Sequence, residues 1–344
     1  MKLVLFLFLL FPIVVFGQNN YSFASKKAFK SAESLMIQGE LDKSLIIFKE
    51  VVKEEPKFSE AFLNMSKIEF SKENFKNALS FGKKALENNN VEHSIYSQVG
   101  KSFFMLKDFD SSSYYLQMAN LYGANTANDY YLLSKSENNQ KQFTKALKNI
   151  EKAIEKDNSN SDYYVVRGNS HFGEQDFERA KLDFEKALVL NPNQANLYAN
   201  LAGVNIETND LDAALLNINK GMENSSGDQK LSFLLLKGNY FKQIDELDNA
   251  EIAFNDAYSL DNKNTAVLIN QSAIMIKKGD YINAVEKCSI AIDLDGALPE
   301  AYFNRGIAYE MLKKTNEACS DWEEAFIMGS IKAEEFINSP TCNE

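Results

Sequence analysis

Apolar and small residues recur along this chain in one frame with a period of 34 residues. The stretch that starts at Phe177 reads FERAKLDFEKALVLNP, and 34 residues earlier the same frame returns as FTKALKNIEKAIEKDN, starting at Phe143. Within each half of the unit the apolar residues are spaced by three, four and seven positions, as on an amphipathic helix. The pattern predicts stacked helical hairpins, with turn residues such as Gly39, Asn209 and Gly279 between the two halves.

Three positions of the frame hold small side chains in almost every unit. With Ala180 set as position 20, these are position 8 (Ala32, Ser66, Gly100, Ser134, Gly168, Ala202, Gly238, Ser272, Gly306), position 20 (Ser44, Ala78, Ser112, Ala146, Ala180, Ala214, Ala250, Ala284, Ala318) and position 27 (Val51, Ala85, Ala119, Ala153, Ala187, Gly221, Ala257, Ala291, Ala325). Large side chains fall at positions 4 and 24, as with Phe62 and Phe184. We expect helices to cross at the small positions, with the large side chains filling the spaces between them.

The pattern resembles the tetratricopeptide repeat, a helix–turn–helix unit of 34 residues. The resemblance implies an all-α, right-handed superhelical solenoid of nine repeats: 25–58, 59–92, 93–126, 127–160, 161–194, 195–230, 231–264, 265–298 and 299–332. The sixth repeat is two residues longer than the others, and we assign the extra length to a loop at 225–228. Residues 18–24 are expected to be a lead-in, and residues 333–344 a capping helix and tail.

Residues 1–17 have the pattern of a secretory signal peptide. One basic residue precedes the apolar run Leu3–Phe16, and the small residues Val15 and Gly17 stand before a cleavage site at Gln18. The alternative is an uncleaved membrane anchor, but the run is shorter than the about 20 residues that a spanning helix needs. No cysteine follows the cleavage site, which disfavours a lipoprotein anchor. We therefore expect an exported protein that is periplasmic, on the cell surface or secreted.

The three cysteines have different expected roles. Cys288 occupies position 24 and is expected to be a buried free thiol. Cys319 lies in the last repeat, and Cys342 lies in the tail after Pro340, which allows the tail to fold back. In an oxidising compartment we expect Cys319 and Cys342 to form a disulfide that fastens the cap. The alternative is two reduced thiols.

Several function classes are disfavoured by the sequence. A net charge of −11 argues against binding to nucleic acid or to anionic membranes in general. The two histidines lie in different repeats: His171 takes position 11, a packing position, and His93 opens a repeat. No catalytic triad, metal-ligand spacing or phosphate-binding loop is present. We expect no enzymatic activity, no cofactor and no metal.

The resemblance implies that the first helix of each repeat lines a concave groove, with ligand contacts from positions 2, 5, 9, 12 and 13. Position 9 carries Lys67, Lys101 and Lys135 in three successive repeats, and Asn169 in the next. Such a row would hold the acidic side chains or the terminal carboxylate of an extended partner segment. The alternative is that these lysines are ordinary solvated groups.

Apolar groups accompany this row. Tyr131 at position 5 and Phe104 at position 12 are expected beside the lysines. In the C-terminal half, Ile269 and Phe303 belong to an apolar run along the groove, which either marks a partner site or is covered in part by the cap.

The resemblance therefore implies a non-catalytic exported scaffold or adaptor that binds a protein or peptide through its groove. The family's carboxylate clamp needs Lys at position 5 and Asn at position 9 of one repeat, and it is absent here, since position 5 holds Leu63, Ser97 and Tyr131. One alternative is a structural subunit of a cell-envelope assembly that docks through the convex face or the ends. A second is a carbohydrate-binding or processing protein, which the single Trp disfavours.

Overall fold

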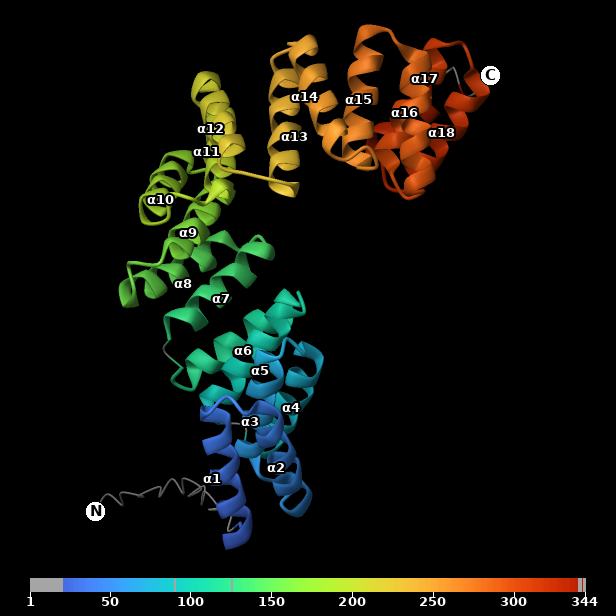
Figure 1. Cartoon of the computed structure of the whole chain (residues 1–344). Coiled ribbons are helices and arrows are strands. Elements are labelled where there is room, and N and C mark those ends of the chain that lie inside the picture. Colours follow the sequence, from blue (N-terminus) through green and yellow to red (C-terminus); the bar gives the residue numbers. More distant parts are fainter. Residues whose placement is uncertain (1–20, 90, 125, 340–341, 343–344) are drawn as a thin grey trace, which may run out of the picture. The chain divides into compact units, whose positions relative to one another are not determined.

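The computed structural model describes residues 21–89, 91–124, 126–339 and 342, and all regular structure in them is helical (Figure 1). The expected signal peptide, residues 1–17, lies outside the described residues. The helices are α1 Phe23–Ile37, α2 Leu41–Glu54, α3 Ser59–Ser71, α4 Phe75–Asn88, α5 His93–Met105, α6 Phe109–Leu121, α7 Ala127–Asn139, α8 Phe143–Lys156, α9 Ser161–Gly173, α10 Phe177–Leu190, α11 Ala195–Glu207, α12 Leu211–Glu223, α13 Asp228–Gln243, α14 Leu247–Leu260, α15 Thr265–Lys278, α16 Tyr281–Leu294, α17 Pro299–Met311, α18 Thr315–Ile327 and α19 Ile331–Ile337.

Consecutive helices pair as hairpins, from α1 with α2 to α17 with α18, and α19 packs on α18. The hairpins fall into two compact units, one with α1–α8 and one with α9–α19, which divide after Asn158. Within each unit every hairpin packs on the next, so each apolar face is buried by its neighbour. The expected all-α repeat fold is confirmed.

Seven of the first helices begin at the residue where the sequence pattern opens a repeat, and two begin earlier. α1 starts at Phe23 because the side chain of Ser22 accepts a hydrogen bond from the Ser25 amide at 3.0 Å and caps the helix. α13 starts at Asp228, inside the expected loop, because Gly227 turns the chain with a φ of 54° directly before it. The capping helix α19 likewise starts at Ile331 rather than at 333.

Each hairpin turns through a residue in the left-handed region, always at position 15. Gly39 and Gly279 tolerate this backbone, but Glu73 and Lys107 adopt it with φ of 61° and 62°. Lys141, Gln175, Asn209, Asp245 and Lys313 do the same. Backbone hydrogen bonds that close each helix end offset a strain of about 1 kcal/mol per residue. One example is the bond from the Asn74 amide to the Glu69 carbonyl at 2.9 Å.

The residues at positions 8, 20 and 27 are all buried, and the helices cross there as expected. Large side chains at position 24 lie directly on position 8 of the same repeat. A Cβ added to Gly168 would lie 2.6 Å from the Phe184 ring, and one on Gly306 would lie 2.5 Å from the Trp322 indole. The small residues are therefore required by contact and not only by helix preference.

Serines at the crossing add hydrogen bonds between the two helices of one hairpin. Ser66 at position 8 donates to the carbonyl of Ala78 at position 20 over 2.6 Å. Ser134 donates to Ala146 in the same way over 2.8 Å. Because the hydroxyl bonds to backbone of the facing helix, the crossing holds the two helices at a fixed separation.

The C-terminal end of the second unit is closed by α19 and a disulfide. The ring of Phe336 on α19 lies 4.7 Å from the Trp322 ring and 5.2 Å from the Phe303 ring, measured between centroids. Cys319 and Cys342 are bonded, with their Cα atoms 5.6 Å apart. Cys288 is a buried free thiol, and burial raises its pKa to about 11, which disfavours the thiolate form.

The small-residue rule can be tested with two glycines of the second unit that sit inside helices. Gly168→Ala places a methyl group against Phe184, and we expect a loss of about 1–3 kcal/mol of unfolding free energy from overpacking. Gly203→Ala is the matched control, because nothing lies within 4 Å of its added Cβ and alanine favours helix by about 0.5–1 kcal/mol. The denaturant midpoint of Gly168→Ala should fall, and that of Gly203→Ala should rise. Equal shifts would refute the close contact between Gly168 and the Phe184 ring.

Candidate functional site

The three lysines at position 9 lie on α3, α5 and α7, the first helices of three consecutive hairpins in the first unit. Asn169 is exposed on α9 in the second unit, so the row within one unit consists of Lys67, Lys101 and Lys135. The surroundings of these three lysines differ.

Lys101 forms an ion pair inside the protein. Its Nζ lies 3.0 Å from Oδ1 of Asp129, a carboxylate that is 1% exposed and also accepts a hydrogen bond from the Ser97 hydroxyl at 2.7 Å. A buried carboxylate without a partner costs several kcal/mol, so Lys101 has a structural role. This contact joins position 9 of one repeat to position 3 of the next.

Lys135 lies among aromatic rings. Its ammonium is 5.3 Å from the centroid of Phe104 and 5.3 Å from that of Tyr131. Each such contact contributes about 0.5–1 kcal/mol at a partly exposed site. Phe104 packs edge-on against Phe109 at 5.7 Å, a pairing that Phe70 and Phe172 repeat with the first residue of their own second helices. The expected neighbours of the row are thus present, but they hold Lys135 in place.

Lys67 is the exposed cation of the row. No ion pair of Lys67 is found in the described part of the chain, and the acid closest in register, Glu33, accepts a hydrogen bond from Asn64 at 3.3 Å. The pKa of Lys67 is lowered, first because surrounding protein atoms desolvate its ammonium and then because Lys101 repels it. Glu33 and Glu92 act on the same ammonium in the opposite direction and raise its pKa. An anionic partner group would likewise offset the repulsion by Lys101.

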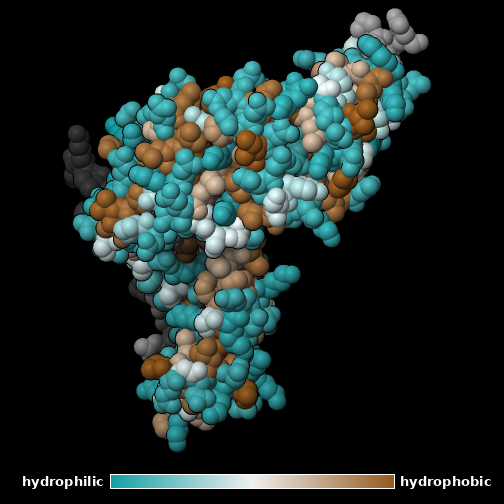
Figure 2. Space-filling model, turned by 45° about the horizontal axis from the view of Figure 1, so that its top comes forward, coloured by the Kyte–Doolittle hydropathy of each residue, from teal (hydrophilic) through white to brown (hydrophobic). Residues whose placement is uncertain are grey.

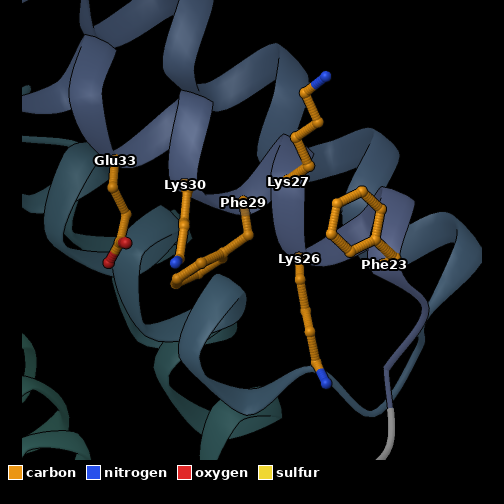
Figure 3. A pocket seen from close by; sticks show the side chains of 6 residues that line it. All are labelled: Phe23, Lys26, Lys27, Phe29, Lys30 and Glu33. Carbon is orange, nitrogen blue, oxygen red and sulfur yellow. The ribbon is translucent and has the colours of Figure 1, made fainter.

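The first helix extends this surface toward the N-terminal end. A hollow of about 530 Å³ lies along α1, lined by Phe23, Lys26, Lys27, Phe29, Lys30 and Glu33 (Figure 3). Lys26, Lys30 and Glu33 project to one side of α1, and Lys27 projects to the other. Since Lys26 and Glu33 occupy positions 2 and 9, the hollow continues the surface that carries the lysine row.

The apolar run expected in the C-terminal half is partly covered. Phe303 packs against Phe336 of the cap, and Ile307 belongs to the same cluster. Ile269 is half-buried and packs beside Leu268. The sequence left open whether the cap covers part of this apolar run. The structure shows that the cap covers it at Phe303.

A second apolar row was missed by the sequence analysis. Leu182, Leu216 and Ile252 are 64%, 54% and 60% exposed on α10, α12 and α14. They share position 22 of three successive repeats, so the repeat spacing itself would have found them. Figure 2 shows one face of the molecule, on which apolar residues are scattered among polar ones.

The histidine at a packing position is not arranged for acid–base chemistry. His171 is buried, 3.9 Å from Asp183, and its pKa is lowered mainly by burial. Arg167 holds the same carboxylate with two hydrogen bonds of 2.9 and 2.6 Å, and Arg305 holds Asp321 in the same way. Within the described residues there is no group of three or more potential metal ligands, and none of the helices has the length and apolarity needed to cross a membrane.

Comparisons with known proteins agree with the repeat pattern. A family model described as "Tetratricopeptide repeat" matches residues 161–194. The fold is similar to the crystal structure of a tetratricopeptide repeat protein from Parabacteroides merdae, at 13% identity and a TM-score of 0.54, over 73% of this chain and 99% of that one. It is also similar to the C-terminal part of a repeat protein from Cytophaga hutchinsonii, at 15% identity and a TM-score of 0.54, over 70% and 98%.

The different roles of the lysines predict different effects on stability. Lys101→Ala removes the ammonium that pairs with the buried Asp129 carboxylate. We expect the free energy of unfolding to fall by about 2 kcal/mol, which is less than for a fully buried pair because Lys101 is partly solvated. Lys67→Ala, which removes the same side chain one repeat earlier, should change stability by less than about 0.5 kcal/mol. Chemical unfolding monitored by circular dichroism measures both, and equal losses would contradict the structural role of Lys101.

Proposed function

We propose that this chain, which is built of tetratricopeptide repeats, is an exported, non-catalytic adaptor that binds a protein partner along the groove side of its first helices. The partner segment is extended and carries acidic groups. The observation that carries the proposal is the exposed side chain of Lys67, which occupies the same repeat position as Lys135 two repeats later. Because the chain as a whole carries a net charge of −11, an exposed lysine such as Lys67 is a point at which an acidic partner segment would be attracted rather than repelled.

The rigidity of the first unit supports this function. Lys101 is fixed by Asp129, and Lys135 is fixed by Phe104 and Tyr131. Side chains that are already ordered lose little entropy on binding, so more of the contact energy appears as affinity. The hollow on α1 adds Lys26 and Lys30 for the same partner.

A structural subunit that docks through its outer face is the second candidate. It is favoured by the exposed row Leu182, Leu216 and Ile252, which stands on second helices rather than first ones. In that case the lysines take no part in binding, and a charge placed in the aliphatic row abolishes it.

Partner capture from an envelope extract separates these two candidates. We expect Lys67→Glu to reduce the captured partner at least tenfold, because it reverses the one exposed charge of the row. Lys76→Glu on α4 is the matched control, with the same charge change away from the row. Leu216→Lys should leave capture unchanged. Loss with Leu216→Lys and retention with Lys67→Glu would favour the second candidate and overturn the first.

Export is a further part of the proposal. It is tested on protein purified from the cells that naturally make it, by determining the N-terminal residue and the state of the cysteines. We expect the mature chain to start at Gln18, since Val15 and Gly17 suit the cleavage site. Peptide mapping without reductant should recover Cys319 joined to Cys342. Edman sequencing or intact mass that finds Met1, together with alkylated Cys319 and Cys342, would contradict export.

A further inference from the structure

The aliphatic row of the second unit has charged residues one helical turn away on both sides. The row itself consists of Leu182 on α10, Leu216 on α12 and Ile252 on α14. Four residues earlier, position 18 holds an exposed acid on each helix: Glu178, Asp212 and Asp248. Four residues later, position 26 holds an exposed lysine on the first two helices: Lys186 and Lys220. Because residues four apart share one helix face, α10 and α12 each present an acid, a leucine and a lysine in line.

The charges of this line on α10 and α12 are not used within the protein. In the part of the chain that the structure describes, no ion pair is found for Glu178, Lys186, Asp212 or Lys220. Beside the line on α10 stand Arg179, which is ion-paired with Asp176, and Glu185. On α14 the line is different, because Lys278 binds Asp248 at 2.6 Å and Asp256 takes the place of the lysine. The unpaired charges therefore belong to α10 and α12.

The helix dipole accounts for only part of this pattern. It favours an acid in the first turn of a helix, which is where Glu178 and Asp212 stand. It gives no reason for leucines to lie exposed between an acid and a lysine in two successive repeats. Exposed apolar residues that form a row, rather than standing singly, are typical of an interaction surface. The row ends at α16, where position 22 holds the exposed Glu286.

The order acid, leucine, lysine matches itself when a second copy of the chain faces it. A two-fold axis along the aliphatic row reverses the direction of α10 and α12 in the facing copy. The leucines of the two copies then meet, and the acids of each copy face the lysines of the other. A two-fold axis parallel to the helices would instead set acids against acids. The charges thus select one orientation of the second copy.

We propose that the second unit binds a second copy of this chain through the outer face of α10 and α12, as a symmetric dimer. Leu182 and Leu216 form the apolar centre of the interface, and Ile252 lies at its edge. The acids at position 18 pair with the lysines at position 26 of the other copy. A foreign partner would not require this self-matching order of charges. The dimer leaves the lysines of the first helices free, so it does not depend on the groove function proposed above.

Sedimentation equilibrium of the purified protein over a series of concentrations tests the dimer. We expect a dissociation constant in the micromolar range, because two helices from each copy give a small interface. Leu216→Glu places a carboxylate at the apolar centre and should raise that constant at least tenfold. Ile327→Glu on α18, an exposed residue away from the row, is the matched control and should leave it unchanged. A protein that stays monomeric at its highest soluble concentration would overturn the proposal, and so would equal effects of the two variants.

Exchanging the charges tests the orientation of the two copies. One variant combines Glu178→Lys with Asp212→Lys, and the other combines Lys186→Glu with Lys220→Glu. We expect each variant alone to dissociate at least tenfold more readily than the unaltered protein, and an equimolar mixture of the two to form a dimer again. Dimers that persist in each variant alone, or a mixture that stays monomeric, would contradict this interface. Lys67→Glu should keep the dimer whatever its effect on partner capture, so the two proposals fail separately.

Discussion

The close crossing of two helices at small side chains is the contact on which the rest of the structure depends. It fixes the separation within each hairpin, as the hydroxyl of Ser66 on the Ala78 carbonyl demonstrates at 2.6 Å. It also creates the spaces that Phe184 and Trp322 fill. Because every repeat uses the same three positions, position 9 returns on successive first helices and position 22 on successive second helices. The rows of lysines and of aliphatic residues are consequences of that regularity.

Much of the fold could be predicted from the sequence, because the information is local and repeated. Small residues at positions 8, 20 and 27 determine which helices pair. The tail could be placed near Cys319 because Cys342 follows directly after the capping helix. The hairpin turns were harder. Glycine marks the left-handed residue at Gly39 and Gly279, but Glu73 and Lys107 take the same backbone without any signal in their side chains. At these two residues the backbone hydrogen bonds that close the first helix select the left-handed conformation. Those bonds form only when the whole hairpin is folded, so the side chain at the turn does not reveal them.

The candidate site was less predictable, because the partner of a side chain depends on another repeat. Position 9 identifies Lys101, yet its charge is used by Asp129 in the following repeat. Phe104 is placed beside Lys135 as expected, and it also closes its own hairpin against Phe109. The sequence therefore finds which residues line a surface. Which of them remain available to a partner is a matter of contacts between neighbouring units.

The most direct test of the central claim is a methyl–methyl nuclear Overhauser measurement on alanine-labelled protein. Ala202 at position 8 and Ala214 at position 20 are both fully buried in one cluster of the second unit. If α11 and α12 cross at their small residues, these two methyl groups should show a strong cross-peak. A spectrum in which both signals are assigned and this cross-peak is missing would contradict the account.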